Sequence, residues 1–273
     1  MKLDGKIIAA EILEQLKKLP QPKEFLAGVL AGDNAASKSF LKQKEKFAKE
    51  LGIDFRIYEF PKDISDGDLQ KELGRISSED GCGGCILQLP LPGGLDEQSA
   101  LNVILPEKDV DVLSEQSLGA FYAGRGNLPP SVAVVEEIIK RLEIDLSGSV
   151  VVVVGAGRLI GKPIAIWLLG RAKELIVLDK GSDFDEIKKA DVIISGTGVP
   201  GLIKGEMLKT GAGVIDFGYS KNSEGKISGD FDYSSLLPPI TCHLQPYFYT
   251  PTPGGTGPIL VAKILENFYK LNS

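Results

Sequence analysis

The chain of 273 residues contains one histidine, three cysteines, two methionines and one tryptophan. The single histidine, His243, excludes metal sites built from several histidines, and it is the one candidate for a histidine-based catalytic triad. Proton transfer near neutral pH is therefore expected from a lysine or a carboxylate. We expect His243 itself to have a structural role.

The sequence also lacks an excess of basic charge and long apolar runs. Its 31 lysines and arginines face 37 aspartates and glutamates, a net charge of -6 that argues against a nucleic-acid partner. No apolar run reaches the ~18 residues needed to span a membrane, and the N-terminus has no apolar signal core. A hydrophobic fraction of 43% argues against intrinsic disorder. We expect a cytoplasmic protein with no membrane partner.

The few cysteines include one C-x-x-C pair, Cys82 and Cys85. A zinc site at this pair needs two more ligands, and only the adjacent Cys242 and His243 remain. A redox pair is the other functional alternative. The simpler interpretation is two small thiols on a buried strand in a reducing compartment, so we expect no metal.

The first third of the chain predicts alternating helices and strands. Apolar spacing indicates helices at residues 7–18, 36–51 and 65–79, and strands at 25–30, 54–60 and 84–89. The Pro- and Gly-rich residues 90–94 must form a loop. Such a succession is typical of parallel strands with crossover helices.

The rest of the chain predicts a second α/β region after a composition shift at residues 124–130, where we expect the domain boundary. Five consecutive valines, 150–154, indicate a central parallel strand buried on both faces. Further elements are expected as strands at 175–178, 192–195 and 213–217, a loop or hairpin at 218–233, and helices at 131–142 and 258–271.

A glycine-rich loop follows the valine strand directly. It reads G-x-G-x-x-x-G, and its candidate cofactor-binding residues are Gly155, Gly157, Arg158, Leu159, Ile160 and Gly161. Glycines here allow a tight turn and close backbone approach to a pyrophosphate, and the next helix offers free N–H donors. The position between strand and helix favours dinucleotide binding over a purely structural turn.

The choice between NAD and NADP depends on the next strand end. Asp179 lies 24 residues beyond Gly155, where a carboxylate can bind a ribose 2′-OH and repel a 2′-phosphate. Arg158, Lys162 and Lys180 are close in sequence and can hold that phosphate instead. Residue chemistry leans slightly to NAD, although Asp179 is also interpretable as a solvated strand end.

Four further segments carry distinctive motifs. Residues 37–46 are similar to S-x-x-Y-V-x-x-K-x-K, and residues 88–92 read Q-L-P-L-P. Residues 106–111 match P-x-K-D-V-D, and residues 251–258 are similar to P-V-P-G-G-V-G-P. In type and order these segments, which cover nearly the whole chain, resemble the motifs of the bifunctional methylenetetrahydrofolate dehydrogenase/methenyltetrahydrofolate cyclohydrolase family.

This resemblance implies two α/β domains with a folate cleft between them. Residues 1–120 are expected to form the folate-binding catalytic domain, on which the C-terminal helix in 254–273 packs back. Residues 121–253 are expected to form a Rossmann-type, doubly wound NAD(P) domain. The family oxidises 5,10-methylenetetrahydrofolate, usually with NADP, and hydrolyses the product to 10-formyltetrahydrofolate. It also forms homodimers through the nucleotide domains, for which residues 218–233 are a plausible arm.

The resemblance also implies three catalytic residues. Lys44 matches the family's catalytic lysine, which polarises or protonates a folate atom or activates water. Gln88 matches the glutamine beside it, whose uncharged amide orients the ammonium without holding it protonated. Asp111 matches the folate-binding aspartate, which accepts hydrogen bonds from a pterin. Lys42 and Lys46 are expected to be solvated neighbours.

Other residues are expected around the substrate. Phe40 is expected to stack on the folate ring system, and Pro253, Gly254 and Gly255 are expected to bind the substrate. The turn that begins with Gly254 and Gly255 can bring backbone N–H groups against it. A plain helix-entry turn is the alternative for the glycines. Asp109 is expected to be an acceptor that fixes its loop.

The sequence departs from the family at five places. Phe40 replaces a tyrosine, Val112 a glycine, Gly157 a serine, and residues 129–132 and 179–181 differ from the usual hinge and strand-end elements. These changes concern cofactor preference and efficiency more than folate chemistry. Two alternatives stay open: a non-catalytic folate- or nucleotide-binding relative, and another two-domain dehydrogenase acting on a hydroxy or amino acid.

Overall fold

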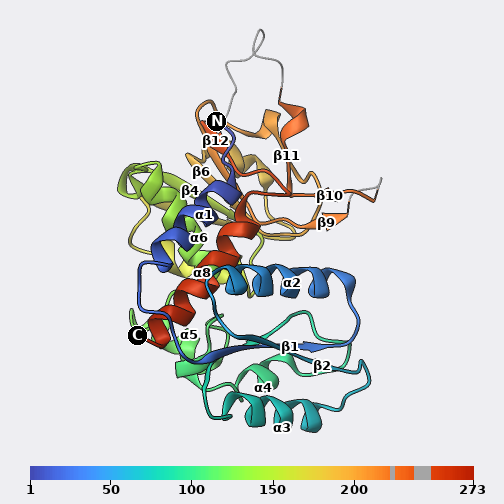
Figure 1. The fold of residues 1–273 in the computed structure, drawn as a ribbon. Helices are drawn as coiled ribbons and strands as arrows, with labels where there is room; N and C mark the ends of the chain where they lie inside the picture. Colours follow the sequence, from blue (N-terminus) through green and yellow to red (C-terminus); the bar gives the residue numbers. More distant parts are fainter. Residues whose placement is uncertain (222–224, 237–246) are drawn as a thin grey trace. The chain divides into compact units, whose positions relative to one another are not determined.

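The computed structural model describes residues 1–221, 225–236 and 247–273 (Figure 1). Contacts group the chain into two compact units: unit 1 comprises residues 1–9 and 131–260, and unit 2 comprises residues 10–130 and 261–273. Each unit is α/β with a parallel sheet, which confirms the predicted fold class. The functional division of the chain with a boundary near residue 120 remains a prediction.

Unit 2 is built on a three-stranded parallel sheet. Its order is β2-β1-β3, with β1 at Phe25–Ala31, β2 at Phe55–Phe60 and β3 at Cys82–Leu87. Crossover helices α2 (Ala35–Glu50) and α3 (Asp66–Ser77) lie on opposite faces of the sheet (Figure 1). All residues of β1 and β3 are buried, as their unbroken apolar and small-residue runs require.

Side-chain caps set where these helices begin. Asn34 accepts from the backbone N–H groups of Ala36 and Ser37, and Ser65 accepts from that of Asp68. Each satisfies donors that have no partner within the helix. The predicted strand at 84–89 begins earlier and ends at Leu87 in the structure, because the polar loop starts at the following residue.

The C-terminal helix α8 (Thr256–Leu271) returns to unit 2, as expected. The Asn267 side-chain amide donates to the carbonyls of Val110 at 2.9 Å and Leu128 at 3.0 Å. Asn272 donates to the carbonyl of Gly83 at 3.0 Å. Unit 2 also contains the helical segments α4 (Glu97–Leu101), η1 (Pro106–Lys108) and α5 (Glu115–Tyr122). Helix α1 (Gly5–Leu16) has residues in both units, and all but the first residue of α6 (Pro130–Arg141) belong to unit 1.

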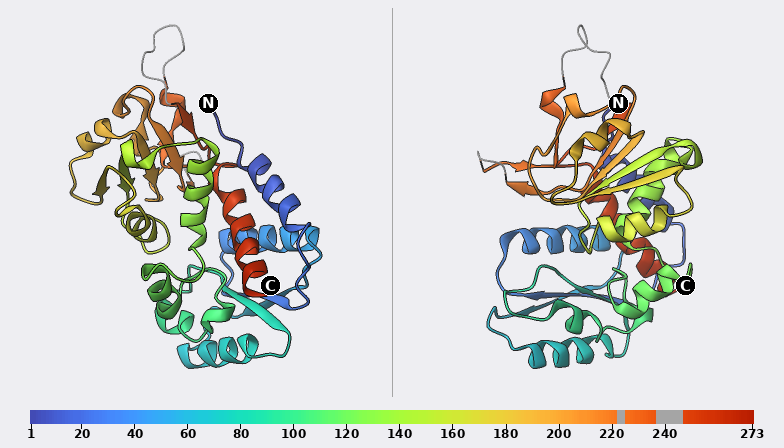
Figure 2. Two further views of the ribbon diagram at one scale, coloured as in Figure 1. Left: turned by 90° about the vertical axis from the view of Figure 1, so that its left-hand side faces the viewer. Right: turned by 180° about the vertical axis from the view of Figure 1, so that it is seen from behind.

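Unit 1 contains a five-stranded parallel sheet of order β12-β8-β6-β4-β5, which Figure 2 shows from two further sides. The strands are β4 (Val150–Val154), β5 (Glu174–Leu178), β6 (Val192–Ser195), β8 (Gly213–Asp216) and β12 (Phe248–Tyr249). Numbered along the chain within the unit, this is order 2-1-3-4-5. The valine strand lies between β5 and β6, as a buried central strand must. The strand order reverses between β4 and β6, where ligands of such sheets bind.

Smaller elements complete unit 1. They are α7 (Gly161–Leu168), β7 (Ile203–Lys204), β9 (Ser220–Lys221), β10 (Ile227–Ser228), β11 (Phe231–Asp232), and the short helices η2 (Leu146–Gly148), η3 (Phe184–Lys189), η4 (Gly205–Met207) and η5 (Tyr233–Ser235). The antiparallel pair β9–β10 is the hairpin expected within residues 218–233. Residues 222–224 of that stretch lie outside the described residues. Cys242 and His243 also lie outside them, so the structural role expected for His243 stays a prediction.

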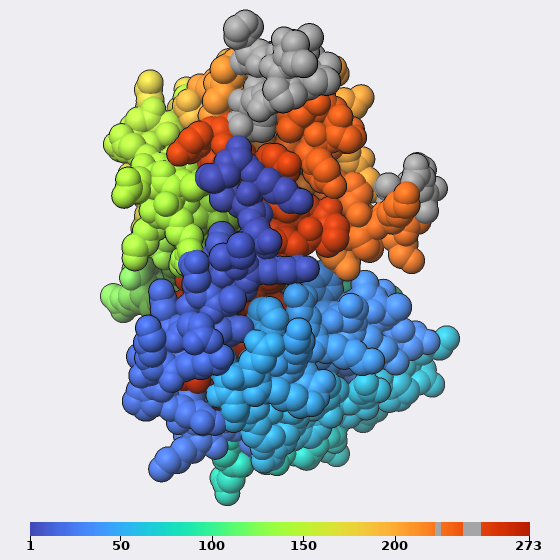
Figure 3. Space-filling view, turned by 45° about the horizontal axis from the view of Figure 1, so that its top comes forward, coloured from blue at the N-terminus to red at the C-terminus, as the bar shows by residue number. Residues whose placement is uncertain are grey.

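The first residues of the chain extend the sheet of unit 1, which the sequence did not predict. The backbone of Tyr249 accepts from Leu3 at 2.8 Å and donates to Met1 at 2.9 Å. Figure 3 shows this N-terminal segment in dark blue against the red and orange residues. The N–H of Gly5 then donates to Gly254 at 2.9 Å. A Cβ on Gly5 would lie 1.7 Å from the Gly255 carbonyl oxygen, so only glycine fits there.

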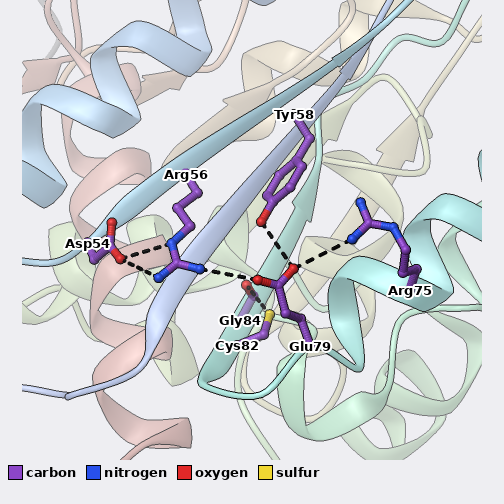
Figure 4. Close-up of polar contacts among 7 residues, drawn as sticks. All are labelled: Asp54, Arg56, Tyr58, Arg75, Glu79, Cys82 and Gly84. Atoms are coloured by element: carbon purple, nitrogen blue, oxygen red, sulfur yellow. Dashed lines mark hydrogen bonds and ion pairs between the residues drawn. The ribbon is translucent and has the colours of Figure 1, made fainter.

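The C-x-x-C thiols lie buried on β3 and form no disulfide, in agreement with the simpler interpretation. Burial raises the pKa of the Cys82 thiol, which donates to the Gly84 carbonyl at 3.4 Å. Figure 4 shows the ionic network beside it: Arg56 contacts Asp54 at 2.9 Å and Glu79 at 3.3 Å. Among the described residues, no group of three or more His, Cys, Asp or Glu side chains is placed to hold a metal.

The described helices include none with the length and apolar character to cross a membrane.

Candidate functional site

Lys44 lies on the buried face of α2. The buried positions of this helix are Ser37, Leu41, Lys44 and Ala48, which follow the spacing of one helical stripe. Only 6% of Lys44 is exposed, whereas Lys42 and Lys46 face solvent, as the sequence predicted. Lysine is rarely buried without a partner, so this position indicates a functional constraint.

Two polar side chains meet the Lys44 ammonium. Its Nζ donates to Gln88 Oε1 at 3.1 Å and lies 3.8 Å from Asp111 Oδ2. Gln88 follows β3 at the carboxyl end of the sheet, and its Nε2 donates to the Leu89 carbonyl at 2.8 Å. That second bond turns the amide oxygen toward the lysine. The structure therefore brings together the three residues predicted to be catalytic.

Asp109 holds the loop that carries Asp111. Its carboxylate accepts from the backbone N–H groups of Leu113 and Ser114, at 3.0 and 2.8 Å. A backbone bridge between Cys85 and Asp109 ties the same loop to β3. The prediction that Asp109 fixes its loop is confirmed, and Asp111 is left facing the lysine.

The electrostatics of the site are set by burial. Burial raises the pKa of the Asp111 carboxyl, the Lys44 ammonium lowers it, and the charge of Asp109 raises it again. The net direction is upward. Desolvation and the charge of Asp109 thus destabilise the ionised form of Asp111 by more than the Lys44 ammonium stabilises it.

Val112 has a backbone φ of +56°, in the left-handed region. We expected valine to adopt such angles less readily than the glycine that the family has at this position, yet Val112 adopts them in the structure. A β-branched residue in this region costs on the order of 1–3 kcal/mol. The side chain is buried, and the N–H of Val112 donates to the Asp109 carbonyl at 3.3 Å. The surrounding loop therefore imposes this conformation on the residue next to Asp111.

The residues expected around the substrate divide between the units. Phe40 is half-buried on α2, one turn before Lys44 and on the same side of the helix. Pro253, Gly254 and Gly255 belong to unit 1, where Gly254 has a φ of +98°. Their role at the substrate remains a prediction.

The glycine-rich loop of unit 1 has the geometry of a phosphate-binding turn. Gly155 has a φ of +92°, and its N–H donates to the Leu178 carbonyl at 2.7 Å. A Cβ on Gly161 would lie 1.7 Å from the Gly155 carbonyl oxygen, while Gly157 faces open space. Gly161, the first residue of α7, has no side-chain cap at Ile160, whereas the Lys162 N–H donates to the Gly157 carbonyl at 3.0 Å and Pro163 has no N–H. The glycines fit a dinucleotide pyrophosphate because they let it approach the backbone at the N-terminus of α7.

The residues expected to select the cofactor lie beside this loop. Asp179 follows β5 and is exposed; its Oδ1 accepts from the N–H of Lys180 at 2.9 Å, and its own N–H donates to Ser182 Oγ at 3.0 Å. Arg158 is half-exposed and Leu159 is 42% exposed.

One part of the loop's surroundings was missed from the sequence. Gly196 and Thr197 follow β6 and pack against the loop: a Cβ on Gly196 would lie 2.5 Å from Ile160, and one on Gly155 would lie 3.0 Å from Thr197. The available signal was the Gly196-Thr197-Gly198 turn directly after a predicted strand of the same sheet.

Comparison with known proteins agrees with this geometry. The model of the tetrahydrofolate dehydrogenase/cyclohydrolase catalytic domain matches residues 3–111, and that of the family's NAD(P)-binding domain matches residues 129–273. The bifunctional protein FolD of Limosilactobacillus reuteri is 36% identical over 277 residues, covering 97% of this chain and 94% of the relative.

Solved structures are similar over their full length. The bifunctional FolD methylenetetrahydrofolate dehydrogenase/cyclohydrolase from Campylobacter jejuni has a TM-score of 0.92 at 33% identity, covering 100% of this chain and 98% of that one. The Trypanosoma brucei methylenetetrahydrofolate dehydrogenase-cyclohydrolase, in complex with NADP and an inhibitor, has a TM-score of 0.89 at 27% identity, covering 99% and 96%.

Replacing Lys44 with methionine is expected to raise the pKa of Asp111 further, because the ammonium is the group that lowers it. The measurement is the carboxyl ¹³C shift of Asp111 against pH, assigned by comparison with Asp111→Asn. Lys42→Met, on the exposed face of the same helix, is the control and should leave the midpoint unchanged. A midpoint that stays or falls in Lys44→Met contradicts the ion pair.

Proposed function

The chain belongs to the tetrahydrofolate dehydrogenase/cyclohydrolase family, and from this premise we propose that it oxidises 5,10-methylenetetrahydrofolate and hydrolyses the methenyl product to 10-formyltetrahydrofolate. The observation that supports this function is the buried cluster of Lys44, Gln88 and Asp111. A second support is the glycine-rich loop at the switch point of unit 1.

In the oxidation, the methylene carbon gives up a hydride, for which a bound nicotinamide is the acceptor. The glycine-rich backbone between Gly155 and Gly161, at the N-terminus of α7, is the part of the chain that would hold the pyrophosphate. Asp111 would accept hydrogen bonds from the pterin's amino and ring N–H groups, which fixes the orientation of the folate.

In the hydrolysis, water adds to the methenyl carbon and the bond from that carbon to N5 breaks. Two protons leave the added water: one reaches N5 and the other is released to solvent, and the Nζ of Lys44 is the group that carries the proton to N5. Gln88 orients the lysine through its amide oxygen at 3.1 Å and adds no charge of its own.

The alternatives raised by the sequence predict different behaviour. A non-catalytic relative, suggested by Phe40, would bind folate without turnover. A dehydrogenase for hydroxy or amino acids would be stabilised thermally by those acids and not by folates. Phe40 retains the flat ring that stacks on folate, so we propose that the missing hydroxyl lowers efficiency without abolishing the reaction.

Lys44→Met is expected to reduce methenyltetrahydrofolate hydrolysis by about 100-fold or more, because proton transfer loses its carrier. The assay follows the loss of the methenyl chromophore, beside methylenetetrahydrofolate oxidation with NAD and with NADP. Lys46→Met, whose side chain is 72% exposed, is the matched control. If Lys44→Met hydrolyses the methenyl compound at the wild-type rate, the lysine does not have this role. If the wild type oxidises methylenetetrahydrofolate with neither NAD nor NADP, the proposed dehydrogenase activity is wrong.

We further propose that NAD is preferred over NADP, because Asp179 would repel a 2′-phosphate. Asp179→Ser is expected to raise kcat/KM for NADP by about tenfold, as one repulsive charge contact is removed. Asp185→Ser, which removes an exposed carboxylate elsewhere in unit 1, should leave the NAD/NADP ratio unchanged. A wild type that favours NADP, or an Asp179→Ser ratio equal to that of the control, would show that Asp179 does not select the cofactor.

We also propose a cytoplasmic homodimer that pairs through unit 1, with residues 218–233 as an arm. The free, buried thiols of Cys82 and Cys85 suit a reducing compartment. Light scattering at micromolar concentration should report twice the chain mass of 29.3 kDa. A monomer under these conditions contradicts the pairing.

A further inference from the structure

Unit 1 contains a buried pair of carboxylates that the proposed chemistry does not use. Asp216 is the last residue of β8, and Asp230 directly precedes β11. Their exposed fractions are 1% and 0%. Among the described residues, no lysine or arginine forms an ion pair with either. Two uncompensated carboxylates are costly inside a protein, which calls for an explanation.

Asp216 fastens the start of β11 to the end of β8. Its Oδ1 accepts from the N–H groups of Gly218 at 2.7 Å and Asp230 at 3.2 Å, and its Oδ2 accepts from that of Phe231 at 3.0 Å. Burial raises the pKa of Asp216 to about 7, and the neighbouring charge of Asp230 adds to the rise. Asp216 therefore retains a proton in acid and up to neutral pH.

Asp230 fastens a different segment. Its Oδ2 accepts from the Ser195 hydroxyl at 2.7 Å and from the backbone N–H of Thr197 at 2.6 Å. Its Oδ1 is buried and has no hydrogen-bond partner. The side chain of Asp230 thus bonds to the end of β6 and to the turn that follows, and its bond to the Thr197 N–H is short.

That turn is the wall against which the glycine-rich loop packs. A Cβ on Gly196 would lie 2.5 Å from Ile160, and one on Gly155 would lie 3.1 Å from the Gly196 carbonyl oxygen and 3.0 Å from the Thr197 side chain. The two segments have no free space between them. A displacement of Thr197 must therefore displace the loop whose backbone would approach the pyrophosphate.

We propose that Asp230 is a positioning residue for dinucleotide binding: its buried carboxylate holds the Gly196–Thr197 turn, and this turn holds the glycine-rich loop. The inference rests on the dinucleotide site of the proposed function. Asp230 lies 75 positions beyond Gly155 in the sequence, and it does not belong to β4, the strand that the glycine-rich loop follows.

The test compares three variants by dinucleotide Kd, from the fluorescence of the reduced cofactor and of the single tryptophan, Trp167. Asp230→Ala is expected to raise Kd and the cofactor KM about tenfold, the cost of one charged hydrogen bond, with kcat at saturation nearly unchanged. Asp230→Asn keeps an oxygen at the same place and should restore wild-type Kd to within about threefold. Asp232→Ala, which removes the acceptor for Ser234, is the matched control.

Methenyl hydrolysis, which needs no dinucleotide, is measured in every variant and should stay at the wild-type rate. An unchanged Kd in folded Asp230→Ala overturns the inference alone, as does an Asp230→Asn as weak as Asp230→Ala. Absence of dinucleotide binding by the wild type overturns the dehydrogenase proposal and this inference with it. If Asp230→Ala does not fold, the test is amide hydrogen exchange of Thr197 in the wild type without cofactor. Slow exchange supports the hydrogen bond from Thr197 to Asp230 as a lasting restraint on the turn, and fast exchange overturns the inference.

Discussion

The burial of one ammonium group is the constraint on which unit 2 depends. Lys44 occupies a core position of α2, where an unpaired charge would be strongly unfavourable. The surrounding chain meets this need with an amide oxygen from the end of β3 and a carboxylate from the loop after η1. The Asp109 hydrogen bonds and the left-handed backbone of Val112 then hold the loop in the conformation that places the Asp111 carboxylate beside Lys44.

Unit 1 reaches a comparable rigidity by different means. At the reversal of strand order, the glycine-rich loop is packed so closely that Cβ atoms are excluded at Gly155, Gly161 and Gly196. Close packing of backbone on backbone lets a ligand approach the N-terminus of α7, while the buried Asp230 holds the adjoining turn. In both units a part of the candidate site follows a parallel strand at its carboxyl end: Gln88 follows β3 and the glycine-rich loop follows β4.

Much of this was accessible from local patterns. The valine run predicted the central strand, and the glycine-rich loop that follows it predicted the phosphate-binding turn, because both depend on residues adjacent in sequence. The burial of Lys44 also follows from a local pattern, because helical periodicity alone puts residues 37, 41, 44 and 48 on one face of α2. The addition of Met1–Leu3 to β12 was not predictable, because a segment of three residues is too short to carry a strand period.

The sequence by itself determined the order of elements, the type of each sheet and the identity of the chemical groups, because propensity, periodicity and motif spacing are local properties. Tertiary structure decided which of several similar groups meet. Asp109 and Asp111 are two residues apart, yet one closes a loop and the other faces an ammonium. Asp216 and Asp230 become a pair only when β8 and β11 are brought together, since long-range contacts depend on packing that no local pattern encodes.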